Sequence, residues 1–193
     1  MRFRETMLAG AFVVQIERHG DDRGFFARTW CTREFAAHGL PENLVQTSMS
    51  RSERRGTVRG MHLQLPPSTE TKLVRCTRGA IYDVIVDLRP DSATFLKHFA
   101  IELVDRAYAA LLIPPLMLHG FQTLEPETEV LYSMTDFYAP ELGLGARWND
   151  PAFGIKWPIT NGVSMLPRDA EYPDFDAAAY RARLSALPLA GRT

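Results

Sequence analysis

The sequence predicts an all-β fold, an antiparallel double-stranded β-helix or jelly-roll barrel. Short runs rich in β-branched and aromatic residues recur along most of the chain. The segments between them are rich in Gly, Pro, Asp, Ser and Asn, at the spacing expected of an antiparallel sandwich or barrel. The length of 193 residues suits one domain with a substantial core. We therefore expect a single domain over residues 1–193, with a barrel core at about residues 40–140 on which N-terminal strands and a C-terminal helical tail pack.

The predicted strands are the β-rich runs that turn residues bound on both sides. They are Ala11–Ile16, Phe25–Trp30, Leu44–Met49, Gly56–Gln64, Lys72–Thr77, Ala80–Leu88, Phe95–Leu103, Ala109–Ile113, His119–Leu124 and Val130–Thr135. A short helix is predicted after the second of these, at Thr32–Gly39, which starts with a capping residue and ends at Gly. A C-terminal helix is predicted at Asp174–Leu187, which is Ala-rich with Leu and Tyr at helical spacing.

A hairpin turn is predicted at Arg78 and Gly79, where the glycine supplies a positive φ between two strands. Side chains alternate between the two faces of the second strand, Ala80–Leu88. If the face with Tyr82 and Val84 is core, Asp83 on the other face points into the barrel. A charge that faces a barrel interior is tolerated only if it is paired or hydrated. We expect Asp83 to pair with Lys72 across the hairpin.

The charge and cysteine content limit the possible partners and compartments. A formal net charge of -1 argues against a general binder of nucleic acid or membrane surfaces, which shows a basic excess. Cys31 and Cys76 are too few for a disulfide framework, so we expect free thiols and a cytoplasmic protein. The N-terminal run MRFRETMLAGAFVV lacks an A-x-A-like cleavage site and is interpreted as a strand. No apolar stretch approaches the ~18 residues that span a membrane.

Residues 56–79 resemble the first motif of the cupin family of small β-barrels. In that motif two His separated by one residue, a Glu and flanking glycines build a metal site. Here His62 occupies the first His position, Gln64 the second, and Lys72 the position of the Glu. His119, in IPPLMLHGF, stands where the second cupin motif carries its His.

These replacements argue against a metal site. Gln64 is a weak neutral ligand, and the ammonium of Lys72 cannot coordinate while it is protonated. Borderline and hard divalent metals favour imidazole together with carboxylate. We expect no metal; a metal-dependent cupin oxygenase or isomerase with His62 and His119 as ligands is the least favoured alternative.

The same residues suit proton abstraction next to a carbonyl. A neutral imidazole at His62 accepts a proton near physiological pH, and the ammonium of Lys72 stabilises the enolate oxygen that develops. A lone His in a strand is more often structural, which is our interpretation of His19, His38 and His98.

Other candidates have structural alternatives, and for Asp169 and Arg59 the sequence spacing alone favours the alternative. Tyr132 or Tyr138 is a candidate for the opposing acid, and the alternative is packing in the core or a turn. Asp169, in LPRD, is a candidate to orient His62; the alternative is a turn residue. Arg59 shares a pocket with His62 only if Gly60 forms a bulge or kink, because residues three apart on a regular strand face opposite ways. The alternative, which is the commoner case, is a solvated arginine on a regular strand.

A further candidate lies in DDRGFF near the N-terminus. Arg23 is suited to bind phosphate, with Phe25 or Phe26 against a base or ring. The alternative is a glycine turn between two strands.

Taken together, the motifs resemble those of the dTDP-4-dehydrorhamnose 3,5-epimerase family of cupin-fold nucleotide-sugar epimerases, over nearly the whole chain. The motifs are DDRGFF (Asp21–Phe26), QTSMS (Gln46–Ser50), VRGMHLQ (Val58–Gln64), KLVRCTRGAIYDVIVDLRPDSATF (Lys72–Phe95), HGFQTL (His119–Leu124), EVLYSMTDFYAP (Glu129–Pro140), WNDPAFGIKWP (Trp148–Pro158) and LPRD (Leu166–Asp169). The resemblance implies an isomerase that needs no metal or organic cofactor and is generally a homodimer, its N-terminal strand helping to build the interface.

The resemblance also implies a role for each site residue. His62 matches the base, Asp169 its orienting carboxylate, Lys72 the residue that stabilises the enolate and Tyr132 the acid that returns a proton to the opposite face of the ring. The substrate-binding matches are Arg23, Phe26, Arg28, Gln46, Ser48, Arg59, His119 and Tyr138. The implied substrate is a nucleotide-linked 4-keto-6-deoxy sugar, inverted at C3, C5 or both.

The chain departs from the family at the edges of the site. Arg28 stands where a Glu facing the nucleotide is usual, and Ser48 replaces an Asn. Leu116 and Leu118 replace small residues of a P-x-G-x-A-H turn, and Gly143 replaces a frequent Glu. The nucleotide base and the sugar therefore remain open, as do two alternatives: a nucleotide-sugar ketoisomerase and a non-catalytic sugar-nucleotide-binding cupin.

Overall fold

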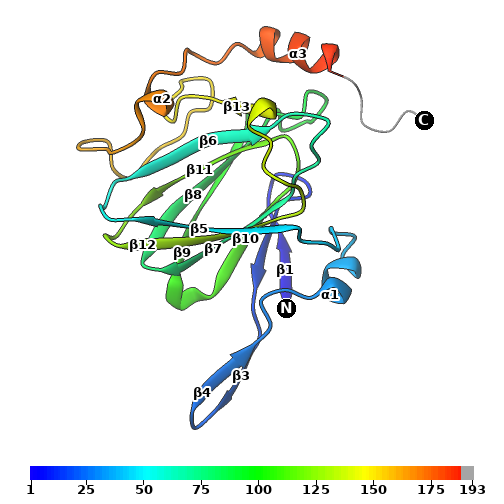
Figure 1. The fold of residues 1–193 in the computed structure, drawn as a ribbon, viewed down its shortest axis with the longest axis vertical. Helices are drawn as coiled ribbons and strands as arrows, with labels where there is room; N and C mark the ends of the chain where they lie inside the picture. Colours follow the sequence, from blue (N-terminus) through cyan, green and yellow to red (C-terminus); the bar gives the residue numbers. More distant parts are fainter. Residues whose placement is uncertain (188–193) are drawn as a thin grey trace.

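Two antiparallel sheets face each other in the computed structural model, which describes residues 1–187 (Figure 1). The six-stranded sheet has the order β1-β2-β10-β7-β12-β5 and the five-stranded sheet has the order β13-β6-β11-β8-β9. In sheet order, the first consists of β1 (Arg2–Glu5), β2 (Phe12–Gln15), β10 (Ala109–Ile113), β7 (Lys72–Arg78), β12 (Thr128–Met134) and β5 (Gln46–Ser52). The second consists of β13 (Gly143–Gly145), β6 (Val58–Gln64), β11 (Met117–Thr123), β8 (Ala80–Asp87) and β9 (His98–Val104). The predicted antiparallel all-β class is confirmed.

A separate hairpin of β3 (Arg18–Asp21) and β4 (Gly24–Ala27) projects away from the sandwich (Figure 1). Every strand pair of the two sheets is antiparallel, and several connections between strands are turns or single helical turns. Two such connections are the 3-10 helices η1 (Asp105–Ala107) and η2 (Pro140–Leu142).

The inward-facing side chains of the two sheets form the central core. Strand alternation sends Val74 and Cys76 of β7 inward from one sheet, and Ile81 and Ile85 of β8 inward from the other. Phe121 of β11 joins them with 1% of its surface exposed.

The C-terminal tail packs on the outer face of the five-stranded sheet (Figure 1). Trp157 and Tyr180 of the tail bury the outward-facing Met61 and Leu63 of β6. The tail contains α2 (Pro167–Ala170) and α3 (Ala177–Ala186). The predicted C-terminal helix is present as α3, but it begins after Asp176, whose carboxylate accepts hydrogen bonds from two backbone N–H groups of the first turn.

Helix α1 (Thr32–Ala36) covers the outer face of the six-stranded sheet through the buried Phe35. The prediction that Thr32 caps this helix is wrong. Cys31 occupies the N-cap position, and no side chain accepts a hydrogen bond from the first turn. The Thr32 hydroxyl instead donates to the backbone carbonyl of Glu42.

Every predicted strand overlaps an observed one, and β10 has the predicted bounds. The N-terminal segment interpreted as one strand forms two, β1 and β2, which pair with each other. The short strands β3 and β13 were not predicted. Each has only three or four residues, and β13 has two glycines, so neither shows an apolar alternation.

The predicted hairpin at Arg78 and Gly79 is wrong. Strand β7 pairs with β10 and β12, whereas β8 pairs with β9 and β11, so the two strands belong to different sheets. Gly79 has a φ of +78°, and a Cβ atom there would lie 2.6 Å from the hydroxyl of Thr128. The glycine is therefore required at a corner where the chain passes from one sheet to the other.

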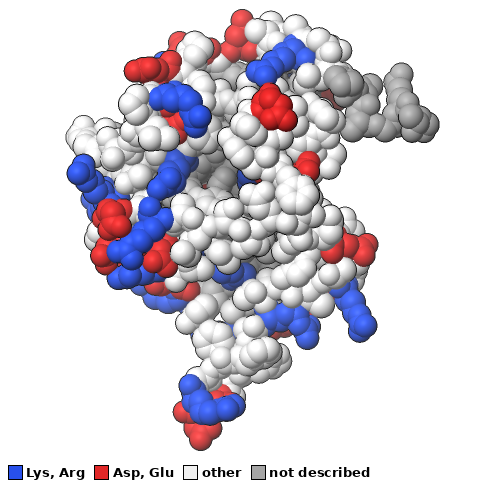
Figure 2. All heavy atoms as spheres, in the orientation of Figure 1, with Lys and Arg blue, Asp and Glu red and all other residues white. Residues whose placement is uncertain are grey.

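Figure 2 shows acidic and basic side chains interspersed on the visible face and at the tip of the β3–β4 hairpin. Within residues 1–187, no helix is long and apolar enough to cross a membrane.

Candidate active site

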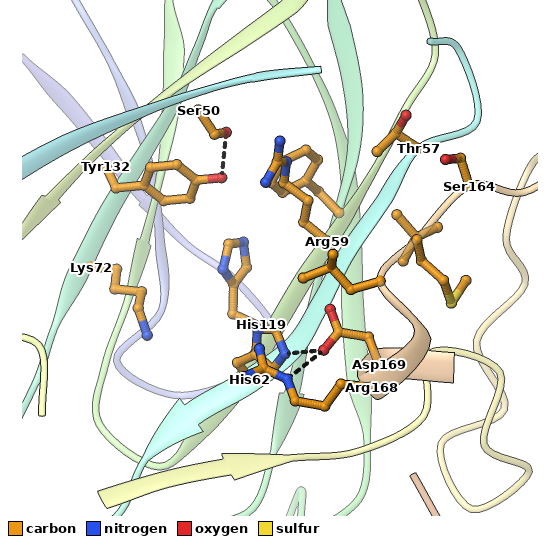
Figure 3. A pocket seen from close by; sticks show the side chains of 14 residues that line it. Ser50, Thr57, Arg59, His62, Lys72, His119, Tyr132, Ser164, Arg168 and Asp169 are labelled. Atoms are coloured by element: carbon orange, nitrogen blue, oxygen red, sulfur yellow. Dashed lines mark hydrogen bonds and ion pairs between the residues drawn. The ribbon is translucent and has the colours of Figure 1, made fainter. Parts of the chain in front are cut away.

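A cavity of about 510 Å³ opens between the two sheets and the C-terminal tail (Figure 3). It receives side chains from all three walls: Lys72 and Tyr132 from the six-stranded sheet, His62 from the five-stranded sheet, and Asp169 from α2. The remaining lining residues are Ser50, Thr57, Val58, Arg59, His119, Phe121, Ser164, Met165, Leu166 and Arg168. The structure thus brings together the four residues predicted to carry the chemistry.

Strand β6 contains the irregularity that a pocket shared by Arg59 and His62 requires. The pairing of β6 with β11 shifts register between the pairs His119–His62 and Phe121–Arg59, so two residues of β6 oppose one of β11. Gly60 has a φ of +121°, and a Cβ atom there would lie 2.5 Å from Cα of Gly120. This bulge turns Arg59 and His62, three residues apart, into the same cavity.

Nε2 of His62 lies 2.9 Å from Oδ1 of Asp169 (Figure 3). The carboxylate is almost fully buried, and Nε of the neighbouring Arg168 lies 3.4 Å from the same oxygen. Since a carboxylate accepts hydrogen bonds, Nε2 carries the hydrogen and Nδ1 keeps a free lone pair. Burial lowers the pKa of His62; Asp169 opposes this shift, while Arg168 and Lys72 add to it. The imidazole is therefore held neutral and oriented, as a general base requires.

On the opposite wall, the hydroxyl of Tyr132 lies 3.0 Å from Oγ of Ser50 (Figure 3). Burial raises the pKa of Tyr132, and the negative charge of Asp83 adds to the shift, whereas the hydrogen bond with Ser50 opposes it. The phenol keeps its proton at neutral pH and can donate it toward the cavity.

The predicted pair of Lys72 with Asp83 is wrong, because each has another partner. Nζ of Lys72 lies 2.6 Å from Oε2 of Glu70, and Oδ1 of Asp83 lies 2.7 Å from Nε2 of His119. Asp83 and Lys72 do both face the interior, as predicted, but from strands of different sheets. A buried carboxylate needs a nearby donor, and the imidazole of His119 on the adjacent strand β11 supplies it.

Three of the predicted substrate-binding residues lie at the rim. Gln46 and Ser48 follow Ser50 outward on the same face of β5, since side chains two apart share a face. Oε1 of Gln46 accepts a hydrogen bond from the backbone of Tyr138 at 3.2 Å. Tyr138 lines a second cavity of about 290 Å³, which shares His62 with the first.

Two more, Arg59 and His119, line the first cavity. The remaining three, Arg23, Phe26 and Arg28, lie on or next to the β3–β4 hairpin and line neither of these two cavities of their own chain. The Phe26 side chain is exposed, and Arg23 forms an ion pair with Asp21 at the tip. Arg28 is held by Glu34 of α1 at 2.6 Å.

Within residues 1–187, no group of three or more His, Cys, Asp or Glu side chains is placed to hold a metal ion. His119 is engaged by Asp83, and Lys72, which occupies the position of the cupin Glu, brings a cationic side chain to the cavity wall. The donor set does not suit a divalent metal.

The chain is similar to proteins of known function. The sequence profile of the family described as dTDP-4-dehydrorhamnose 3,5-epimerase matches residues 5–177. A dTDP-4-dehydrorhamnose 3,5-epimerase of Sinorhizobium fredii is 38% identical over 173 residues, which are 90% of this chain and 89% of that protein. The chain belongs to the dTDP-4-dehydrorhamnose 3,5-epimerase family.

Solved structures of the family share the fold, which confirms the predicted cupin type. The dTDP-4-dehydrorhamnose 3,5-epimerase of Bacillus anthracis, solved with TDP and pyrophosphate bound, matches with a TM-score of 0.86 at 37% identity, covering 90% of this chain and 99% of that one. NovW, a 4-keto-6-deoxy sugar epimerase from the novobiocin biosynthetic gene cluster of Streptomyces spheroides, matches with a TM-score of 0.87 at 34% identity, covering 98% and 93%.

Sequence reasoning about this epimerase-family chain missed Ser50, Arg168 and Glu70. A signal existed for each. Ser50 is two residues from Ser48, and Glu70 is two residues from Lys72. Residues two apart on an extended strand share a face. Arg168 precedes Asp169 in a segment interpreted as a turn, which the structure shows to be the short helix α2.

Proposed function

We propose that this protein epimerises a nucleotide-linked 4-keto-6-deoxyhexose at C3, C5 or both, without a cofactor. The observation that carries the proposal is the placement of a neutral, carboxylate-oriented base, His62, across one cavity from the phenol of Tyr132. Inversion of a carbon centre needs a base and an acid on opposite faces of the ring, and the two sheets supply one each.

The reaction follows from the positions of these groups. His62 Nδ1 takes the proton from the carbon next to the 4-keto group, and the C–H electron pair moves to form the enolate. The ammonium of Lys72 stabilises the negative oxygen. Tyr132 then donates its proton to the opposite face of the same carbon, and the double bond returns to the carbonyl. Proton exchange with water restores the neutral imidazole and the phenol.

The substrate-binding roles of the remaining residues follow from charge. Arg59 lines the cavity, its Nε donating to Ser52 Oγ at 3.1 Å and one Nη to the Arg51 carbonyl at 3.0 Å. We assign Arg59 to the diphosphate, because a fixed guanidinium suits phosphate oxygens. His119 and Tyr138 are assigned to the sugar side and Gln46 and Ser48 to the nucleotide side.

The test is incorporation of solvent deuterium. The purified protein is incubated in D₂O with dTDP-, CDP-, GDP- and UDP-linked 4-keto-6-deoxyhexoses, and the C3 and C5 positions are followed by NMR. We expect exchange and inversion with at least one of them, and none with His62→Ala. A 3-keto product would indicate the ketoisomerase instead, and binding without exchange would indicate a non-catalytic protein.

We also propose that the protein acts as a homodimer. The β3–β4 hairpin carries Arg23 and the exposed Phe26 away from the cavity of its own chain, although both match substrate-binding residues. A second copy that receives the hairpin at its own cavity would bury the exposed ring and place both side chains at a site.

Subunit mixing tests this arrangement. His62→Ala and Arg23→Ala are each inactive or weakened alone, but heterodimers of the two contain one intact site. Random exchange then restores about a quarter of wild-type activity, since half of the molecules are heterodimers with one of two sites intact. A monomer in light scattering, or no recovery after exchange, would contradict the proposal.

We place the protein in the cytoplasm, because Cys31 and Cys76 are both free in the structure. Cell fractionation with an antibody against the protein tests this location.

A further inference from the structure

Lys72 lies where the two cavities meet. His62, Lys72 and Arg168 line both the 510 Å³ cavity and the 290 Å³ cavity. The Lys72 side chain is 18% exposed, so its ammonium is largely withdrawn from bulk water. A flexible four-carbon side chain at such a junction can point into either cavity unless another group holds it.

Glu70 is the group that holds it. Its Oε2 lies 2.6 Å from Nζ of Lys72, and its side chain is only 7% exposed. Within the described part of the chain, Lys72 is the only cation paired with this carboxylate. Exposed ion pairs contribute little, but a pair this well buried fixes the geometry of both partners.

The backbone around Glu70 is fixed as well. The N–H of Thr71 donates to Oγ1 of Thr135 at 2.8 Å, and the N–H of Thr135 donates to the carbonyl of Thr71 at 3.1 Å. The N–H of Glu70 donates to Oγ of Ser68 at 3.3 Å. Both ends of the Glu70–Lys72 pair therefore start from an anchored main chain.

We propose that Glu70 is a positioning residue that holds the Lys72 ammonium at the junction of the two cavities. One of the three N–H donors of Lys72 binds Glu70, which leaves two to bind the substrate oxygen. A fixed donor stabilises a developing oxyanion better than a mobile one, because no reorganisation is needed during the reaction. The role rests on the proposed function, in which Lys72 stabilises the enolate.

The opposite effect is also physically possible, and the experiment distinguishes the two. A carboxylate beside Lys72 partly neutralises its charge, which by itself would weaken its hold on an enolate. If positioning dominates, removal of Glu70 lowers kcat; if neutralisation dominates, removal raises it.

The test is a double-mutant cycle of Glu70→Gln and Lys72→Met, with deuterium exchange into the best 4-keto sugar nucleotide as the readout. We expect Glu70→Gln to lower kcat about 10-fold while KM changes less than about two-fold, since the contact is made in the transition state. In the Lys72→Met background the same change should have no further effect. Glu70→Ala, which keeps no acceptor, should lower kcat more than Glu70→Gln.

Glu53→Gln is the matched control. Glu53 pairs with Arg51 at the same two-residue spacing, but on the surface with 69% of its side chain exposed. Glu53→Gln should therefore leave kcat unchanged. Thermal unfolding of each variant reports whether it folds.

An unchanged or higher kcat in folded Glu70→Gln and Glu70→Ala overturns the positioning role, and so does an equal loss with and without Lys72. A folded wild-type protein without any exchange instead overturns the proposed function, and the role of Glu70 with it.

Discussion

His62 and Asp169 are 107 positions apart in the chain, yet Nε2 of one lies 2.9 Å from Oδ1 of the other. The bond joins a strand of the five-stranded sheet to the C-terminal tail. We expect Asp169→Asn to lower kcat about 10- to 100-fold, because an amide can present its NH₂ to Nε2 and favour the wrong tautomer. Steady-state kinetics measures the loss. Asp174→Asn, at an exposed carboxylate of the same tail, is the control and should keep full activity.

The acid limb of the pH–rate profile should lie below the ordinary histidine value. Burial lowers the pKa of His62 from 6.5, so the neutral base persists as the pH falls. We expect kcat/KM of the wild-type protein to decline only below pH 6.5. Arg168→Gln should move the limb to higher pH, because the charge of Arg168 contributes to the lowering. A wild-type midpoint above 6.5 would contradict a neutral buried base.

Tyr132→Phe should separate proton removal from inversion. Without the phenol, His62 can still take a proton and return a deuteron to the same face, so exchange continues. We expect the inverted product to fall about 100-fold while exchange persists without inversion. NMR distinguishes the two outcomes in one sample. Ser50→Ala keeps the Tyr132 proton donor and should change the rate only a few-fold; equal loss of exchange and inversion in Tyr132→Phe would rule out this division of roles.

Gly60→Ala should destabilise the protein strongly. A methyl group at Gly60 meets the backbone of Gly120 at 2.5 Å, and its φ of +121° disfavours any side chain. We expect a loss of about 3 kcal/mol or more in urea unfolding. Gly39→Ala is the control for φ alone: φ is +66° there, but no atom lies within 4 Å, so a loss of about 1 kcal/mol is expected.

Asp87 should make stability depend on acid pH. Burial raises the pKa of this carboxyl, but hydrogen bonds from Arg89, Ser92 and Thr94 outweigh it and lower the pKa from 3.8 to about 2. Because the folded pKa is the lower one, the stabilisation of about 2 kcal/mol is present above pH 3.8 and is lost as the pH falls toward 2. Asp87→Asn should therefore lose stability at pH 7, measured by urea unfolding, and show less acid sensitivity. Asp91→Asn, exposed in the same loop, should match the wild type.

Local patterns predicted most strands, and the family resemblance supplied most members of the site, but neither predicted how the strands pair. Alternation in β8 correctly placed Asp83 inward. The glycine at position 79 correctly signalled a sharp turn. It did not show whether the next strand would pair with β7 or cross to the other sheet, because the same residue permits both. The partner of Lys72 was consequently misassigned to Asp83 instead of Glu70.

The bulge at Gly60 could be stated from the sequence only as a condition. Arg59 and His62 could share a pocket only through an irregularity at the glycine between them, and the structure contains it. By contrast, α2 spans only four residues and has no periodicity to detect. The hydrogen bond between Ser50 and Tyr132 depends on the register of β5 against β12, which no local pattern specifies.

The position of Asp169 has a consequence for the order of events during synthesis. Every strand in residues 1–187 precedes it, so the ribosome completes both sheets before it adds the carboxylate that orients the base. A nascent or truncated chain that ends before α2 would contain His62, Lys72 and Tyr132 but no partner for the imidazole. Proton transfer therefore becomes efficient only after α2 has docked beside the two sheets.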